Sequence, residues 1–273
     1  MKQKSSKKLL STSLLLVLIA LVSLTAATTA WMTIADSTRL KTMRLDVTSG
    51  ANLRFDLDSH ETFEEYVKSL RLIDIADRIL RDQGYHPREN PLSPVTTTDC
   101  IHFTLENGEP AATESYMEFV LHFMATDDMV VHLTTAGEDG TRIFSDEVSD
   151  IAKAMRISFT ADDSTAVYDP GMEPGSEEGL GGKIFGLARG NRIVYDASNT
   201  LFFLKAGVDK PVTVRIWLEG TDEICTDALR GVPYNIQLRF VGTDENGNLL
   251  EDSRTATRRS AAATPTEERN ENK

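Results

Sequence analysis

The chain has 273 residues, enough to bury one large or two small hydrophobic cores. Its composition, 26% charged and 40% hydrophobic, excludes a wholly disordered protein. The formal net charge is −13, and it becomes −17 without the four lysines of residues 1–30, so the remaining body should be repelled by nucleic acid and by anionic lipid head groups.

The first thirty residues form a targeting signal. A basic start, MKQKSSKK, precedes 22 uncharged residues over 9–30, and their most apolar part, 14–24, has the length of a signal-peptide core. Thr28 and Ala30 are small residues that indicate cleavage near Ala30. If uncleaved, residues 9–30 would just span a bilayer of ~30 Å as an anchor helix with its lysines in the cytoplasm. The body should be extracytoplasmic in either case.

The next segments predict two strands and then a helix. Apolar side chains alternate over residues 40–58 on both sides of a Ser-Gly turn, which indicates two short strands. From residue 61 the apolar spacing becomes i, i+3, i+4, which predicts an amphipathic helix over 61–83 that ends at Gly84. It is the only convincing helix outside the signal.

Residues 115–124 and 129–134 again alternate, and we expect them to form a hairpin around the turn at 125–128. If the apolar residues of both strands face the core, His122 lies opposite His132 on the outer face. A zinc site needs three or four protein ligands, and no third ligand shares that register. A partly exposed aromatic pair is therefore the favoured interpretation.

Residues 161–183 contain two prolines and five glycines and few apolar residues, so we expect a long, mobile surface loop. The glycines match neither GxxxxGK[ST] nor GxGxxG, which excludes a phosphate loop. Further strands are expected at residues 152–160, 193–195, 201–204, 212–218 and 236–241.

The tail over 246–273 is polar and lacks periodic apolar residues, which predicts disorder. The short strands at roughly ten-residue spacing predict a mainly β domain over 31–245, an antiparallel jelly-roll-like β-sandwich with one inserted helix. Regular alternation of strands and helices is missing, which excludes a doubly wound parallel sheet.

The segment RIWLEGTDEICTDALRG, residues 215–231, is the most site-like part of the chain. Glu219, Asp222 and Asp227 follow a predicted strand and are the candidate metal ligands. A Ca²⁺ site needs six to eight oxygens and a DxDxDG-like loop, which this segment lacks, so acids that order a turn are favoured over a Ca²⁺ site. Trp217 faces away from the Val/Ile row of its strand, and is either covered by a second layer or exposed as a ligand platform.

Two cysteines, Cys100 and Cys225, lie in the body that we expect to be exported, where a disulfide is permitted. Both a Cys100–Cys225 bond and two separate thiols remain open. The five histidines include no HExxH pair, no serine lies in GxSxG, and neither cysteine lies in a nucleophile motif. We therefore predict a protein that is not an enzyme and holds no catalytic cofactor.

Four segments together carry a family resemblance. AWMTIADSTRLKTMRLDVTSGANLRFDL (30–57) resembles the start of exported Gram-positive proteins whose signal peptide is processed by the SipW-type peptidase, the group that includes TasA and the camelysin-like surface proteins. Residues 116–133, 151–159 and 214–231 are similar to segments of clostridial relatives of that group. The helix at 61–83 and the loop at 161–183 look like insertions relative to the family.

The resemblance implies a non-enzymatic cell-surface or biofilm-matrix protein with a SipW-type signal peptidase as partner. If the chain assembles, residues 31–57 are the natural donor strand for a neighbouring copy. Camelysin-like proteins have been described as peptidases, but this chain has no zinc motif, so no activity is carried over. The alternative is a surface module that binds glycan or Ca²⁺ through Trp217 and residues 219–227.

Overall fold

The computed structural model describes residues 40–47, 52–146, 150–226, 229 and 232–250. The expected signal or anchor at 1–30, the cleavage site at Ala30 and most of the expected polar tail lie outside the described residues. Among the helices that are described, none has the length and apolar character needed to cross a bilayer.

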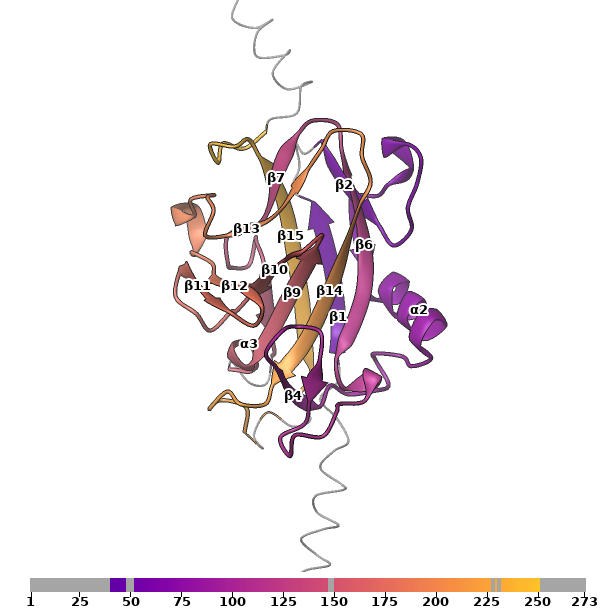
Figure 1. Ribbon diagram of the computed structural model, residues 1–273, viewed down its shortest axis with the longest axis vertical. Coiled ribbons are helices and arrows are strands. Elements are labelled where there is room, and N and C mark those ends of the chain that lie inside the picture. The colour runs from indigo at the N-terminus through magenta and orange to yellow at the C-terminus, as the bar shows by residue number, and fades with distance from the viewer. Residues whose placement is uncertain (1–39, 48–51, 147–149, 227–228, 230–231, 251–273) are drawn as a thin grey trace, which may run out of the picture.

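Two mixed β-sheets form the body (Figure 1). The six-stranded first sheet has the order β13 (Thr200–Leu204), β7 (Met129–Leu133), β15 (Tyr234–Thr243), β1 (Leu40–Val47) and β3 (Ser69–Arg71), and β8 (Arg142–Phe144) also pairs with β15. The nine-stranded second sheet has the order β11 (Gly175–Gly179), β12 (Gly182–Gly186), β10 (Ser164–Tyr168), β9 (Met155–Ala161), β14 (Lys210–Glu219), β4 (Pro94–Thr97) and β5 (Phe103–Thr104), while β6 (Met117–Ala125) pairs with β14 and with β2 (Leu53–Asp56). The helical elements are α2 (Leu72–Gln83), α3 (Ile151–Ala154) and the 3-10 turns η1 (Phe63–Glu65), η2 (Thr113–Ser115) and η3 (Gly190–Arg192).

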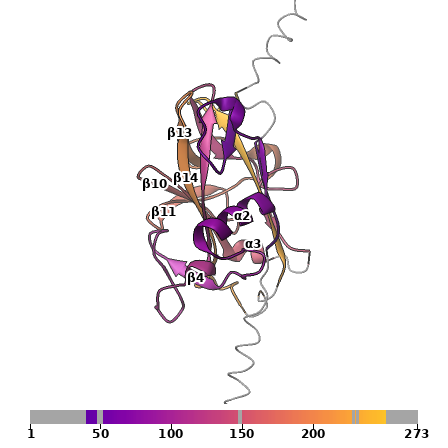
Figure 2. The same ribbon diagram turned by 90° about the vertical axis from the view of Figure 1, so that its right-hand side faces the viewer.

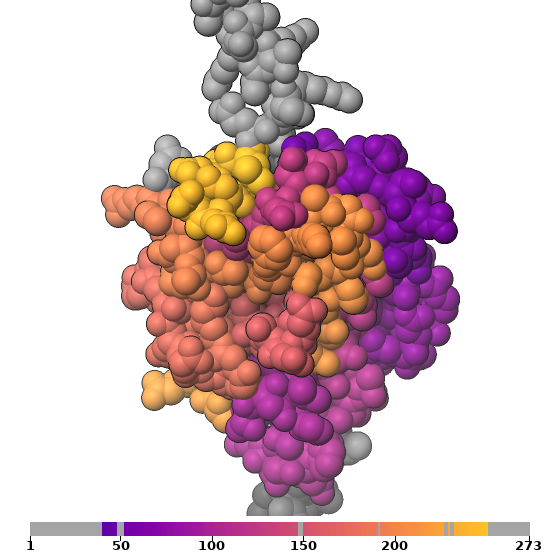
Figure 3. Space-filling view, turned by 45° about the horizontal axis from the view of Figure 1, so that its top comes forward, coloured from indigo at the N-terminus to yellow at the C-terminus, as the bar shows by residue number. Residues whose placement is uncertain are grey.

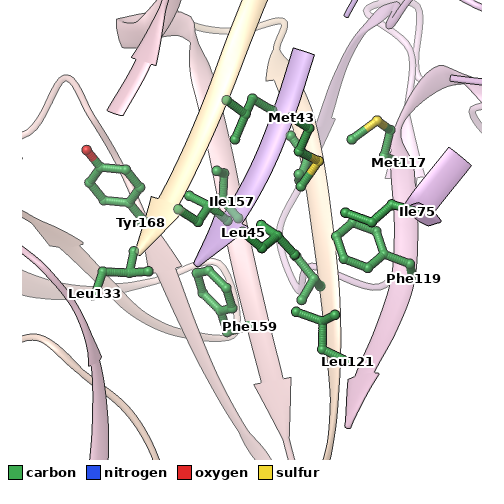
Figure 4. Close-up of a cluster of buried hydrophobic side chains, with 14 of the residues drawn as sticks. Met43, Leu45, Ile75, Met117, Phe119, Leu121, Leu133, Ile157, Phe159 and Tyr168 are labelled. Atoms are coloured by element: carbon green, nitrogen blue, oxygen red, sulfur yellow. The ribbon is translucent and has the colours of Figure 1, made fainter. Parts of the chain in front are cut away.

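The main core lies between the two sheets. Phe240 of the first sheet packs against Phe55, Phe123 and Phe159 of the second, at ring-centroid distances of 5.7, 5.2 and 5.9 Å. Figure 4 shows Leu45 of β1 pointing into the same core. The expectation of a mainly β, sandwich-like architecture is therefore confirmed.

The expectation of purely antiparallel pairing is wrong. Among the described strands, three pairs are parallel: β1 with β15, β10 with β12, and β14 with β4. Side-chain alternation does not distinguish the two directions, because both place successive side chains on opposite faces. The jelly-roll connectivity remains a prediction.

The inserted helix is shorter than expected. Helix α2 begins at Leu72, and the residues before it form η1 and the short strand β3. Its start is fixed by Asp74, whose carboxylate accepts a hydrogen bond from the Arg71 backbone N–H at 2.9 Å. Gly84 ends it with a φ of 80°. Figure 2 shows α2 on the side of the sandwich, where it packs against β6.

The expected hairpin over 115–134 is wrong. Strand β6 belongs to the second sheet and β7 to the first, so the turn between them leads the chain from one sheet to the other. His122 therefore does not lie opposite His132. Both strands alternate because each has one face on the shared core, and this alternation is the same for a hairpin and for a corner between sheets.

The expected loop over 161–183 is also wrong, because β10 and β11 lie within it and β12 begins in it. Glycine allows close strand approach here: a Cβ on Gly182 would lie 2.2 Å from the Thr165 carbonyl oxygen. Conversely, residues 193–195, expected to be a strand, have no strand structure. They follow η3 and belong to the loop before β13.

Candidate functional site

The first described strand, β1, lies in the first sheet between β15, its main partner, and the short edge strand β3. Seven residues of β1 pair in parallel with β15, from Leu40 opposite Tyr234 to Val47 opposite Phe240. Its other neighbour, β3, covers only three residues of it. The first and last strands of the described chain are therefore hydrogen-bonded neighbours in the first sheet.

The inward face of β1 is apolar. Leu40, Met43 and Leu45 are 2%, 2% and 0% exposed and belong to the main core. Burying side chains of this size stabilises a fold by ~1.5–3 kcal/mol each. The body therefore needs a strand at this position, whichever copy of the chain supplies it.

Polar groups on the other face of β1 fix its register. The Thr42 hydroxyl donates to Asn235 Oδ1 at 2.7 Å. Asp46, which is buried, forms an ion pair with Arg44 of its own strand at 2.7 Å. A slip by one residue would separate Thr42 from Asn235 and turn Leu45 away from the core. The site on β15 that receives β1, called the seat of β1 below, is therefore specific for this sequence.

The acidic segment after β14 forms an ordered turn. Glu219 accepts hydrogen bonds from Trp217 Nε1 at 2.9 Å and from the Thr221 hydroxyl at 2.7 Å. Asp222 forms an ion pair with Arg156 at 2.8 Å. Asp227, the third predicted ligand, lies outside the described residues. Within the described part of the chain, no three metal-ligating side chains form a group that could hold an ion.

Trp217 is fully buried. Of the two possibilities left open by the sequence, it is therefore covered by a second layer and is not exposed as a ligand platform. It lies on the outer face of the second sheet in a small cluster with Val95, Cys100, Phe103 and Val167. The Phe103 ring meets it edge-on at 5.4 Å. The indole therefore presents no face to a ligand.

The two cysteines lie in different layers. Cys100 belongs to the cluster around Trp217, whereas Cys225 packs against the main core between the sheets. No disulfide joins them. Burial raises the pKa of the Cys100 thiol to about 11, which leaves it protonated and unreactive at neutral pH.

The structure also contains a charged cluster that sequence reasoning missed. Arg156, at the start of β9, forms ion pairs with Asp169 at 3.1 Å and with Asp222 at 2.8 Å. The three side chains are only 12–18% exposed. The guanidinium thereby joins the segments after β10 and β14 to the start of β9.

A second missed cluster centres on Asp209, just before β14. His122 Nδ1 lies 2.8 Å from Asp209 Oδ2, the Tyr66 hydroxyl donates to Oδ1 at 2.8 Å, and the Ser59 hydroxyl donates to Oδ2 at 2.9 Å. Burial alone would raise the pKa of Asp209, but these hydrogen bonds outweigh it and lower the pKa. The carboxylate thus fastens the segment around η1 to the second sheet.

Asp209→Asn should lower the free energy of unfolding by about 2 kcal/mol at pH 6, because hydrogen bonds to a charged acceptor are lost. Because the folded-state pKa of Asp209 is lowered, its contribution is complete above the ordinary value near 3.9 and is lost as pH falls through the folded value. Urea titrations of both proteins at pH 6 and below pH 4 should therefore converge in acid. Asp162→Asn, which removes an exposed ion pair to Lys210, is the matched control and should cost less than about 1 kcal/mol. An equal cost for both variants at pH 6 would contradict the role of Asp209.

No catalytic arrangement of nucleophile, base and oxyanion donors is formed by the groups described above. What the geometry does supply is a specific apolar seat for one strand. Comparison with known protein families, with characterised proteins and with solved structures finds no match for this chain.

Proposed function

We propose that this chain is an exported, non-enzymatic structural protein of the cell surface or extracellular matrix, whose copies join by exchanging strand β1. The observation that carries the proposal is the seat of β1 on β15, with buried Leu40, Met43 and Leu45 and the Thr42–Asn235 hydrogen bond on its other face. The resemblance of residues 30–57 to the mature start of TasA-like proteins supports it.

The energetics favour exchange at high local concentration. When β1 of one copy pairs with β15 of a neighbour, it makes the same contacts as it makes with β15 of its own chain. The free energies of the monomer and of the strand-exchanged assembly therefore differ mainly by the entropy lost on association. Assembly then requires that a chain release its own β1. Residues 48–51 connect β1 to β2 in the sequence, so a released β1 would stay covalently joined to its own body through them.

The remaining features of the proposal rest on the sequence. We propose that a SipW-type peptidase cuts near Ala30, which places β1 close to the new N-terminus, and that the body is a jelly-roll-like sandwich outside the cytoplasm. A glycan or Ca²⁺ module is less well supported, because Trp217 is buried and the described acids Glu219 and Asp222 bond to protein donors.

Strand exchange is tested by two single-cysteine variants made in a Cys100→Ala, Cys225→Ser background. Arg44 and Gln237 lie opposite each other on β1 and β15. When exported Arg44→Cys and Gln237→Cys chains are mixed and oxidised, a disulfide between the two different chains should form, because β1 of one copy sits on β15 of the other. Non-reducing electrophoresis followed by mass spectrometry identifies this product.

The matched control is Lys41→Cys, at the irregularity between Leu40 and Thr42, where no β15 residue is opposite. It should not cross-link to Gln237→Cys. If the Arg44→Cys and Gln237→Cys mixture gives no mixed disulfide, whereas a single chain with both substitutions cross-links internally, then β1 stays in its own chain and the assembly proposal fails.

A further inference from the structure

His132 of β7 is a buried imidazole whose two nitrogens bond to two different parts of the fold. The residue is 1% exposed. Its Nδ1 lies 2.8 Å from Asn199 Oδ1 and 3.1 Å from the Asn199 carbonyl oxygen, in the loop before β13. Its Nε2 lies 3.2 Å from Thr243 Oγ1 at the end of β15. One side chain therefore connects β7, β15 and the loop 193–199.

The partners of Nδ1 determine which nitrogen carries the proton. Asn199 Nδ2 donates to the Val194 carbonyl, so its Oδ1 is the atom that faces His132. Both partners of Nδ1 are therefore acceptors, and Nδ1 must be the N–H donor of the neutral ring. Nε2 is left as the only position that can take up a second proton.

The Thr243 hydroxyl can serve both protonation states of His132. Its oxygen also lies 3.0 Å from the Asp244 carbonyl oxygen. With the neutral ring, the hydroxyl can donate to Nε2. With the protonated ring, Nε2–H donates to Oγ1 while the hydroxyl proton turns to the Asp244 carbonyl, so no hydrogen bond is lost.

The described hydrogen-bond partners of the ring, Asn199 and Thr243, are uncharged and offer an imidazolium no ion pair. The Tyr195 ring lies 5.1 Å away. Of the charged groups that act on the ring, Asp196 attracts a positive charge and Lys183 repels one. Burial lowers the pKa of His132, and its bonds to Asn199 oppose this only in part. A proton on Nε2 is therefore bound more weakly in the closed structure than in water.

We propose that His132 is an acid-sensing residue, and that uptake of a proton at Nε2 releases the loop 193–199 and with it the start of β13. The loop supplies Asn199 and Tyr195 to the ring, so its opening would expose an imidazolium to water. The turn 244–250, yellow in Figure 3, lies beside it, and Gly247 packs closely on the Tyr195 carbonyl. This proposal does not depend on strand exchange by β1.

The direction of the pH effect follows from linkage. The closed structure binds the proton less tightly than the open loop, so the closed state loses stability as pH falls below the ordinary histidine value near 6.5. Strand β13 is the last strand on its side of the first sheet, and Leu201, Phe202 and Leu204 are buried there. Acid therefore loosens an apolar sheet edge, which is the kind of surface that pairs with another strand.

Hydrogen exchange of the purified full chain in detergent tests the proposal. After correction for intrinsic rates, amides of residues 194–204 should exchange at least about threefold faster at pH 5 than at pH 7.5. Amides of β14 should show no such change. His132→Asn keeps a donor toward Asn199 but cannot titrate, so its exchange in this segment should be equal at both pH values.

NMR titration of the imidazole protons gives a second readout that does not need a folded variant. The His132 midpoint should lie below the ordinary histidine value near 6.5. Thr243→Val removes the acceptor of Nε2–H and should lower the His132 midpoint further. A His132 midpoint at or above the ordinary histidine value near 6.5, or a pH-independent exchange rate in residues 194–204 of the unmodified chain, would overturn the proposal.

Discussion

Arg156→Met should lower the free energy of unfolding by about 3 kcal/mol at pH 7. The substitution keeps the apolar stem but leaves two poorly hydrated carboxylates, Asp169 and Asp222, without their shared cation. It also removes the hydrogen bonds from Arg156 to the carbonyl oxygens of Lys153 and Met155. Urea denaturation followed by circular dichroism measures the effect.

The cost of Arg156→Met should shrink on acidification. Burial already raises the pKa of Asp169, although Arg156 lowers it, and loss of the cation raises it further. The folded variant then binds more protons than the unfolded chain, so its stability increases as pH falls from 7 to about 4.5. Lys153→Met, which removes an exposed ion pair to Asp150, is the control and should cost less than about 1 kcal/mol at either pH. A pH-independent cost for Arg156→Met would contradict the electrostatic explanation.

Trp217→Ala should destabilise the body by about 3–5 kcal/mol, because the cavity left by a fully buried indole is not refilled. The loss includes the hydrogen bond from Nε1 to Glu219, whose carboxylate is itself buried. Thermal and urea unfolding of the variant and of the unmodified chain, both followed by circular dichroism, measure this loss.

The control for Trp217→Ala is Phe203→Ala, which truncates a 46% exposed aromatic side chain on β13 and should cost less than half as much. If Trp217→Ala instead leaves stability unchanged and abolishes binding of a glycan, the indole is a ligand platform, and the surface-module alternative replaces the structural proposal.

The sequence indicated which faces of the strands are buried much better than which strands are neighbours. A strand was expected at residues 152–160, and the alternating apolar residues Met155, Ile157 and Phe159 are all 0% exposed on one face of β9. By contrast, β11 reads GSEEG and is mostly exposed, so its pairing with β12 depends on the backbone alone and leaves no apolar pattern. For the same reason, the sequence did not reveal which strands pair or which pairs are parallel. Alternation of apolar residues indicates which face of a strand is buried, but not which strand lies next to it.

The polar clusters around Asp209 and Arg156 could not be predicted from the sequence, for a different physical reason. Asp209 meets His122 across 87 positions and Tyr66 across 143. No spacing rule connects such residues, since only the folded sheets bring them together. The acidic segment at 219–227 was conspicuous because its residues are close in sequence, yet Asp222 finds its partner Arg156 66 positions away.

The pairing of β1 with β15 has a consequence for how the chain reaches its final structure. Thr42 and Asn235 are bonded across 193 positions, so the earliest strand to be synthesised cannot find its place until nearly the last strand has emerged. Contacts of such long sequence separation form slowly, because a large loop must close before they contribute. Until β15 has been synthesised, β1 therefore lacks its main partner strand and its apolar face is not buried in the core. During that interval a molecular chaperone or a second nascent chain can bind it.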